Sequence, residues 1–153
     1  MTGPGIDRDR GHLQHAIELA QCCPVSPTAF SVGALIIDAE GSLLATGYSR
    51  ETDPHDHAEE AALAKLGPDD ARLGDATIYS SLEPCSVRAS RPRSCTGLIL
   101  ATPIPRIVFA WREPALFVDC QGAELLRAAG REVVELPEFA YLVRRTNRHL
   151  LKP

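Results

Sequence analysis

The chain has 153 residues, of which 44% are hydrophobic and 24% charged, and its formal net charge is −4 at neutral pH. A chain of this size can bury a hydrophobic core without disulfide support, and the composition is that of an ordinary soluble globular protein. The acidic balance argues against a dedicated nucleic-acid-binding protein. The apolar run Val32–Ile37 ends at Asp38, far short of a membrane span.

The N-terminal residues 1–11 contain four consecutive charged residues and no apolar stretch of the kind found in signal peptides. We therefore expect a cytoplasmic protein whose residues 1–11 are disordered or loosely packed, followed by a single domain over residues 12–153. Within this domain, apolar residues at helical spacing predict a first helix over His12–Cys22, ended by the prolines that follow.

The next segments alternate between strand and helix patterns. Ser31–Asp38 is almost wholly apolar, which indicates a buried strand, and Leu43–Tyr48 follows a Glu-Gly turn, which predicts a hairpin. Ala58–Leu66 predicts an alanine-rich helix. The remaining predicted elements are a strand at Thr77–Ser81, a helix at Cys95–Leu100, a strand at Arg106–Trp111, a helix at Gln121–Ala129, a strand at Glu132–Leu136 and a helix at Glu138–Leu150.

Strands that are separated by helices pair in parallel, whereas the two strands of a hairpin pair antiparallel. The sequence therefore predicts an α/β fold with a five-stranded mixed sheet and helices on both faces. Ligands in such folds bind at the carboxyl ends of the strands. Two segments rich in reactive side chains stand at suitable places, one at the start of the second helix and one after the third strand.

The second helix is preceded by His57, with Glu59 two residues later, and the third strand is followed by Pro84-Cys85, with Cys95 ten residues further on. One imidazole and two thiolates make a zinc site with three protein ligands, and an open fourth position marks a catalytic zinc. Zinc lowers the pKa of a bound water from ~15.7 to about 7. Glu59 is close enough to move protons in the same pocket without being a ligand.

Other reactive residues have plainer interpretations. The cysteine count of five is odd, so metal binding or burial is favoured over a disulfide framework. Cys120 is predicted to open a helix remote from the metal ligands. His55 has no glutamate two residues later and is not interpreted as a metal ligand, and Glu60 is interpreted as a solvated helix residue that points off the pocket. Basic residues of the loop between the two cysteine ligands either contact an anionic group or are solvated; they are Arg88, Arg91 and Arg93.

The sequence resembles the cytidine-deaminase-like superfamily of zinc deaminases and, within it, the deaminase domain of riboflavin biosynthesis (diaminohydroxyphosphoribosylaminopyrimidine deaminase-like). The resemblance covers nearly the whole chain. It rests on Phe30–Ala34, on His57-Ala58-Glu59, on Ser81–Ser86 (Ser-Leu-Glu-Pro-Cys-Ser) and, more weakly, on Gln121–Gly130. It implies a three-layer α/β/α fold and a Zn²⁺ cofactor held by His57, Cys85 and Cys95, with Glu59 as general acid and base.

The implied activity is that of a hydrolase acting on cyclic amidine C–N bonds. Its substrate is a small aminopyrimidine-type heterocycle: a nucleobase, a nucleoside or a ribosylamino-pyrimidine phosphate. Zinc-bound hydroxide attacks the amino-bearing ring carbon, Glu59 transfers the protons, and ammonia departs. The expected partners are the small-molecule substrate and further copies of the chain, as a dimer or tetramer, with no membrane. The expected substrate-binding residues are Phe30, Arg50, Ser81, Arg91 and Trp111.

Departures from the family pattern bear on the substrate. The loop between the two cysteines is one residue longer than is usual in the riboflavin enzymes and far longer than in nucleoside and transfer-RNA deaminases, which favours the riboflavin branch. However, Ala29, Arg50 and Val87 stand where that branch has asparagine and histidine residues that help to hold the phosphorylated substrate. Whether this substrate carries a phosphate therefore stays open. A reductase step would need another protein.

Two alternatives remain. A nucleic-acid (RNA) base deaminase is favoured by the basic C-terminal residues, but the net charge and the few aromatic residues available for base stacking count against it. A non-catalytic zinc-binding relative would need a fourth ligand, for which Cys120 is the candidate. Such a protein would have no use for Glu59.

Overall fold

The computed structural model describes residues 4–67, 69–88, 92–112, 114 and 120–151. Its strands form one mixed sheet in the order β2-β1-β3-β4-β5. Strand β1 pairs antiparallel with both β2 and β3, whereas β3–β4 and β4–β5 are parallel pairs. The strands are β1 (Gly33–Ile37), β2 (Leu43–Tyr48), β3 (Thr77–Leu82), β4 (Arg106–Trp111) and β5 (Glu132–Glu135).

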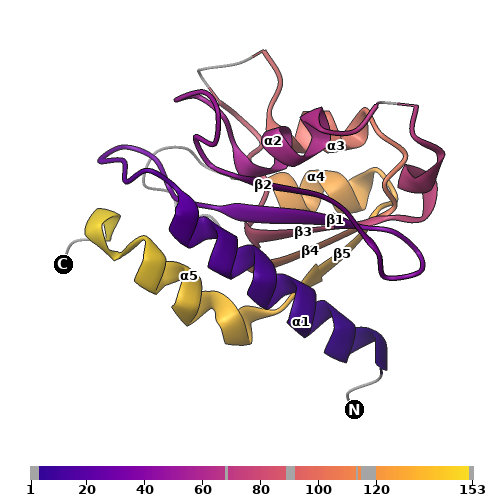
Figure 1. The fold of residues 1–153 in the computed structure, drawn as a ribbon, viewed down its shortest axis with the longest axis horizontal. Helices are drawn as coiled ribbons and strands as arrows, with labels where there is room; N and C mark the ends of the chain where they lie inside the picture. Colours follow the sequence, from indigo (N-terminus) through magenta and orange to yellow (C-terminus); the bar gives the residue numbers. More distant parts are fainter. Residues whose placement is uncertain (1–3, 68, 89–91, 113, 115–119, 152–153) are drawn as a thin grey trace.

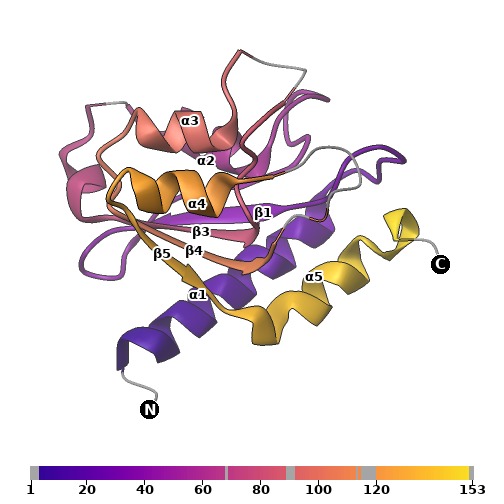
Figure 2. The same cartoon turned by 180° about the vertical axis from the view of Figure 1, so that it is seen from behind.

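Helices cover both faces of this sheet (Figures 1 and 2). On one face lie α1 (Pro4–Leu19) and α5 (Ala140–Thr146), and on the other lie α2 (Ala58–Ala64), α3 (Cys95–Leu100) and α4 (Gly122–Ala128). The predicted three-layer α/β/α fold with a five-stranded mixed sheet is confirmed. None of the described helices combines the length and the apolar character that crossing a membrane requires.

The first helix begins earlier than the sequence pattern predicts. Residues 4–11 belong to α1, so the expectation of a disordered or loosely packed segment is wrong for this part of the N-terminus. The reason is a long-range contact: the Asp9 carboxylate accepts hydrogen bonds from the Arg106 guanidinium at 2.7 and 2.6 Å and from the Tyr79 hydroxyl at 2.7 Å. Asp9 is only 1% exposed, so this turn of the helix is anchored to the sheet.

The start of β1 and the last predicted helix also differ from the prediction. Strand β1 begins at Gly33 rather than Ser31, because the backbone N–H groups of Ser31 and Val32 donate to the side chains of Asn147 and Ser49 rather than to a neighbouring strand. The predicted last helix is divided into short pieces, namely a 3₁₀ turn at Pro137–Phe139, α5, and a 3₁₀ turn at Arg148–Leu150.

Apolar side chains fill the space between the sheet and each helical layer, and all five residues of β1 are buried. Helix α2 approaches β2 unusually closely at Gly47. A Cβ atom at Gly47 would contact the carbonyl oxygen of Ala58 and lie 2.5 Å from the backbone nitrogen of Ala62. The missing side chain therefore sets how closely the start of α2, and the residues next to it, can sit against the sheet.

Candidate active site

The three residues predicted as metal ligands come together at one edge of the sheet. His57 is the residue that precedes α2, Cys85 follows β3, and Cys95 is the first residue of α3. The His57 Nδ1 atom lies 3.5 Å from Cys85 Sγ and 3.3 Å from Cys95 Sγ, and all three donor atoms lie within 4.8 Å of one another. Tetrahedral zinc with its usual bond lengths separates such donors by about 3.6 Å, so the donor set fits this ion.

The polar surroundings of Cys85 favour its metal-binding form. Hydrogen bonds from the side chains of Cys95 and His57, together with the Cys95 backbone N–H at 3.2 Å, lower the pKa of the Cys85 thiol to about 4 despite its burial. The thiolate, not the thiol, is the form that binds a metal. Cys85 is therefore prepared for ligation at neutral pH.

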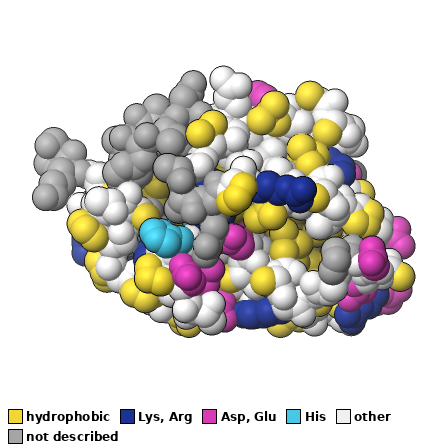
Figure 3. Space-filling view, turned by 90° about the horizontal axis from the view of Figure 1, so that it is seen from above, with side chains coloured by type: hydrophobic (Ala, Val, Ile, Leu, Met, Phe, Trp, Pro, Cys, Tyr) yellow, Lys and Arg dark blue, Asp and Glu magenta, His cyan; other side chains and the backbone are white. Residues whose placement is uncertain are grey.

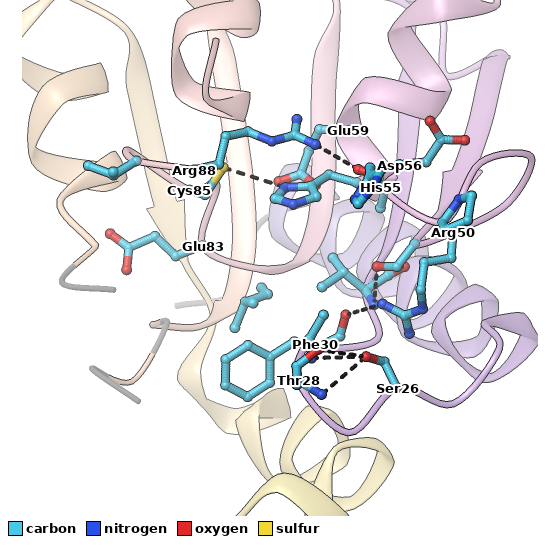
Figure 4. A pocket seen from close by; sticks show the side chains of 18 residues that line it. Ser26, Thr28, Phe30, Arg50, His55, Asp56, Glu59, Glu83, Cys85 and Arg88 are labelled. Atoms are coloured by element: carbon cyan, nitrogen blue, oxygen red, sulfur yellow. Dashed lines mark hydrogen bonds between the residues drawn. The ribbon is translucent and has the colours of Figure 1, made fainter. Parts of the chain in front are cut away.

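Glu59 lies in the first turn of α2 and is 4% exposed. Burial, and secondarily the charge of Cys85, raise the pKa of its carboxyl group to about 7. A carboxyl group with such a pKa can accept and release a proton near neutral pH. Glu59 lines the same cavity as Cys85, and Figure 4 shows both at one end of that cavity.

Glu60 is not among the described residues that line the cavity, but its carboxylate is not freely solvated as predicted. Its carboxylate accepts hydrogen bonds from the backbone N–H of His57 at 3.3 Å and from Arg88 Nη2 at 3.2 Å. Arg88, whose side chain is 3% exposed, also donates to the carbonyl oxygen of His55 at 2.7 Å. The prediction of a solvated Glu60 is thus wrong: the residue ties the start of α2 to the loop after Cys85. A glutamate three residues after a helix-capping position is the sequence signal for this arrangement.

The cavity has a volume of about 490 Å³, which lies within the range of small-molecule sites. One end carries Glu59 and Cys85, and the other carries Phe30 and Arg50 (Figure 4). His57 lies at the first end, beside Cys85. His55, which the sequence does not indicate as a metal ligand, is exposed and also lines the cavity. The candidate acid Glu59 and the candidate substrate-binding residues Phe30 and Arg50 thus line one cavity.

The predicted substrate-binding residues are placed differently from one another. Phe30 lines the cavity and packs edge-on against Trp111, with ring centroids 5.8 Å apart, so Trp111 supports the cavity wall from behind. Ser81 is fully buried and its Oγ accepts a hydrogen bond from the backbone N–H of Gly33 at 3.1 Å. Arg50 lines the cavity, with its guanidinium bound to backbone carbonyls. Arg91 lies outside the described residues.

Cys120 lies near the ligand loop, so the prediction that it is remote is wrong. Its Sγ donates a hydrogen bond to the carbonyl oxygen of Pro84 at 3.2 Å. Helix α4 can approach this loop closely because Gly122 has no side chain: a Cβ at this position would collide with the carbonyl oxygen of Pro84. The buried Glu83 carboxylate also holds the helix there, by accepting a hydrogen bond from Ala123 N at 2.9 Å. Among the described residues, the group that could hold a metal consists of His57, Cys85 and Cys95, without Cys120.

Comparison with known proteins gives consistent matches. Residues 6–111 match the family model described as the cytidine and deoxycytidylate deaminase zinc-binding region. The chain is 41% identical over 131 residues to the diaminohydroxyphosphoribosylamino-pyrimidine deaminase of Schizosaccharomyces pombe, covering 84% of the chain and 32% of that protein. It is 34% identical over 129 residues to the riboflavin biosynthesis protein RibD of Aquifex aeolicus, covering 82% of the chain and 34% of that protein.

Among solved structures, RibD from Acinetobacter baumannii matches with a TM-score of 0.81 and 28% sequence identity, over 95% of this chain and 39% of that chain. The chain spans about a third of the length of the S. pombe and A. aeolicus relatives. The family match covers more than half of the chain and includes His57, Glu59 and both cysteine ligands. The chain belongs to the cytidine and deoxycytidylate deaminase zinc-binding family.

Proposed function

We propose that this chain is a zinc-dependent hydrolytic deaminase of a small aminopyrimidine-type heterocycle. The observation that carries the proposal is the buried carboxyl group of Glu59, which shares one cavity with a three-residue donor set suited to zinc. A structural zinc site is usually closed by a fourth protein ligand and has no need of such an acid. The deaminase names of the relatives support the same reaction type.

In this proposal His57, Cys85 and Cys95 hold the zinc. When bound, zinc supplies a water activated for attack on the amino-bearing ring carbon. The Glu59 carboxylate accepts a proton from that water and passes it to the ring nitrogen. Glu59 then delivers the second proton of the water to the departing amine, which leaves as ammonia while a ring carbonyl forms. General acid–base catalysis of this kind contributes on the order of 10²–10⁴-fold.

The remaining residues orient the substrate. Phe30 offers an apolar ring at the end of the cavity away from Glu59, and Trp111 fixes the position of that ring. The S. pombe relative is named for a ribosylated, phosphorylated aminopyrimidine, and we propose this compound as the first substrate to test. Arg91 remains a proposed contact for its phosphate.

Ammonia release from a panel of amino heterocycles tests the proposal. The panel contains the riboflavin-pathway aminopyrimidine phosphate, cytosine, cytidine, deoxycytidine monophosphate and guanine. We expect zinc-dependent ammonia release from one compound, abolished in Cys85→Ser, because that variant lacks a thiolate ligand. Protein that binds no zinc after metal supplementation, and releases no ammonia, would contradict the proposal.

We also propose that the enzyme acts in the cytoplasm, that residues 12–153 form a single domain together with the start of α1 at Pro4, and that the chain assembles as a dimer or tetramer. The five cysteines are free thiols, in keeping with a reducing compartment.

The described side chains on the face shown in Figure 3 mix acidic, basic and apolar groups, a poor match to the phosphate backbone of a nucleic acid. Light scattering on the zinc-loaded protein measures the assembly: a mass of one chain would refute the oligomer.

A further inference from the structure

The segment of residues 24–31 forms the end of the cavity away from Glu59 (Figure 4). It has neither helical nor strand structure, yet it supplies Ser26, Thr28 and Phe30 to the cavity lining. A segment without a hydrogen-bonded backbone ladder must be held by side chains or local turns if it is to keep one position. Both of its sides are in fact held by side chains from distant parts of the chain.

Arg50 holds the segment from the cavity side. Its Nε and Nη2 donate to the carbonyl oxygen of Pro24 at 3.0 and 2.7 Å, and Nη1 donates to the carbonyl oxygen of Phe30 at 3.2 Å. Nη2 also donates to Ser31 Oγ at 2.9 Å. A guanidinium group has five N–H donors, and these contacts commit four of them to one segment. The backbone of Arg50 adopts a φ of 59°, a conformation that L residues rarely take, and its N–H bonds Asp56 O at 2.8 Å.

Asn147 and His149 hold the segment from the other side. The fully buried Asn147 accepts a hydrogen bond from the backbone N–H of Ser31 at 2.6 Å and donates to the carbonyl oxygens of Ser31 and Val143, both at 3.1 Å. His149 Nε2 donates to the carbonyl oxygen of Ser26 at 2.9 Å. These two residues follow α5 and lie beyond residues 6–111, the stretch that matches the family model. The C-terminal part of the chain therefore helps to build the cavity wall.

We propose that Arg50 and Asn147 are positioning residues that fix segment 24–31, so that Phe30 presents its ring to the substrate, and that Arg50 acts through this segment rather than by binding an anionic group of the substrate. The proposal rests on the proposed deaminase function. It differs from the sequence expectation for Arg50, because the guanidinium already holds four backbone and side-chain contacts at the edge of the cavity.

Steady-state kinetics of Arg50→Gln separates the two roles when measured on the phosphorylated aminopyrimidine and on its dephosphorylated counterpart. A positioning role predicts that KM rises by about tenfold for both compounds, whereas kcat changes by less than about twofold, since only ring binding is affected. In a Phe30→Ala background the same substitution should change KM little, because the two residues act as a unit. A loss confined to the phosphorylated substrate would overturn the proposal.

Arg50→Lys provides the conservative comparison. Lysine keeps the charge but cannot span the carbonyl oxygens of Pro24 and Phe30 with a planar fork of donors, so it should behave like Arg50→Gln. Full rescue by lysine would show that charge alone matters and would overturn the proposal. Arg72→Gln is the matched control: the exposed Arg72 side chain hydrogen-bonds Asp70 and does not line the cavity among the described residues, so this substitution should leave KM unchanged.

Amide hydrogen exchange supplies a readout that does not depend on turnover. Arg50→Gln and Asn147→Asp should each accelerate exchange in residues 28–32, while exchange in β4 and zinc content stay as in the unmodified protein. Asn147→Asp retains the acceptor for Ser31 N but removes the donor to the carbonyl oxygens of Ser31 and Val143, so its unfolding midpoint is measured before exchange is compared. If the unmodified protein binds no zinc and deaminates no compound of the panel, the proposed function fails, but exchange still tests the positioning. Unchanged exchange in both variants would overturn it.

Discussion

Gly47→Ala should disable the site without removing any group that lines it. Gly47 lies in β2, and the start of α2 packs directly on it. An alanine Cβ would contact Ala58 O, would lie 2.5 Å from Ala62 N, and would need at least 3.4 Å for an ordinary contact. The start of α2 must therefore move by about 1 Å, and His57 and Glu59 must move with it.

The size of the effect follows from this displacement. A shift of about 1 Å in a catalytic group costs on the order of 10²-fold in rate. We therefore expect kcat/KM to fall by about 10²-fold in Gly47→Ala, with weaker zinc binding because His57 moves away from the two cysteine ligands.

Ammonia release, zinc content and the unfolding midpoint should be measured together, so that a local defect is distinguished from unfolding. Gly74→Ala is the matched control: a Cβ at Gly74 would meet nothing within 4 Å, so activity and zinc content should be unchanged. Full activity in a folded, zinc-loaded Gly47→Ala protein would refute the argument that close packing of α2 on β2 places the site.

Further predictions concern the ligands and the anchor of α1. Cys95→Ser should release zinc on dialysis and lose turnover with it; metal analysis that finds zinc fully retained would contradict this ligand assignment. Burial alone would raise the pKa of Asp9, but hydrogen bonds from Arg106 and Tyr79 outweigh it and lower the pKa below the usual value. The stabilisation by Asp9 is therefore fully present above the unfolded pKa and is lost as the pH falls through the lower folded value. Asp9→Asn should lower the free energy of unfolding by about 3 kcal/mol at pH 7, because the buried Arg106 contact is lost. Urea titrations should also show that the free energy of unfolding falls less steeply below pH ~4 in the variant than in the unmodified protein. The same dependence on pH in both proteins would contradict this role of Asp9.

Much of the site could be predicted from local sequence. His57 and Cys95 each stand at the start of a helix, and Cys85 follows a buried strand, so their places depend on short-range patterns that helix and strand signals report well. The parallel pairing of β3 with β4 follows from the helix between them. The loop that carries Cys85 then lies at the carboxyl end of β3.

The rest depends on contacts between residues far apart in the chain. Asn147 bonds Ser31 across 116 positions, and Asp9 bonds Arg106 across 97, so neither local periodicity nor composition indicates them. Local sequence does not indicate the burial of Arg88 either. A loop arginine usually stays in solvent, whereas here its side chain is enclosed beside Glu60. Such long-range partners explain the early start of α1, the late start of β1 and the held cavity wall.

Glu59→Gln tests whether Glu59 transfers protons in a zinc-dependent deamination. Glutamine keeps the shape of the side chain and removes its acid–base function. Zinc content and ammonia release should be measured on the same preparation of the variant. A proton-transfer role for Glu59 predicts one zinc per chain, as in the unmodified protein, and turnover lower by on the order of 10²–10⁴-fold. A zinc-loaded Glu59→Gln protein that releases ammonia at the unmodified rate would contradict it.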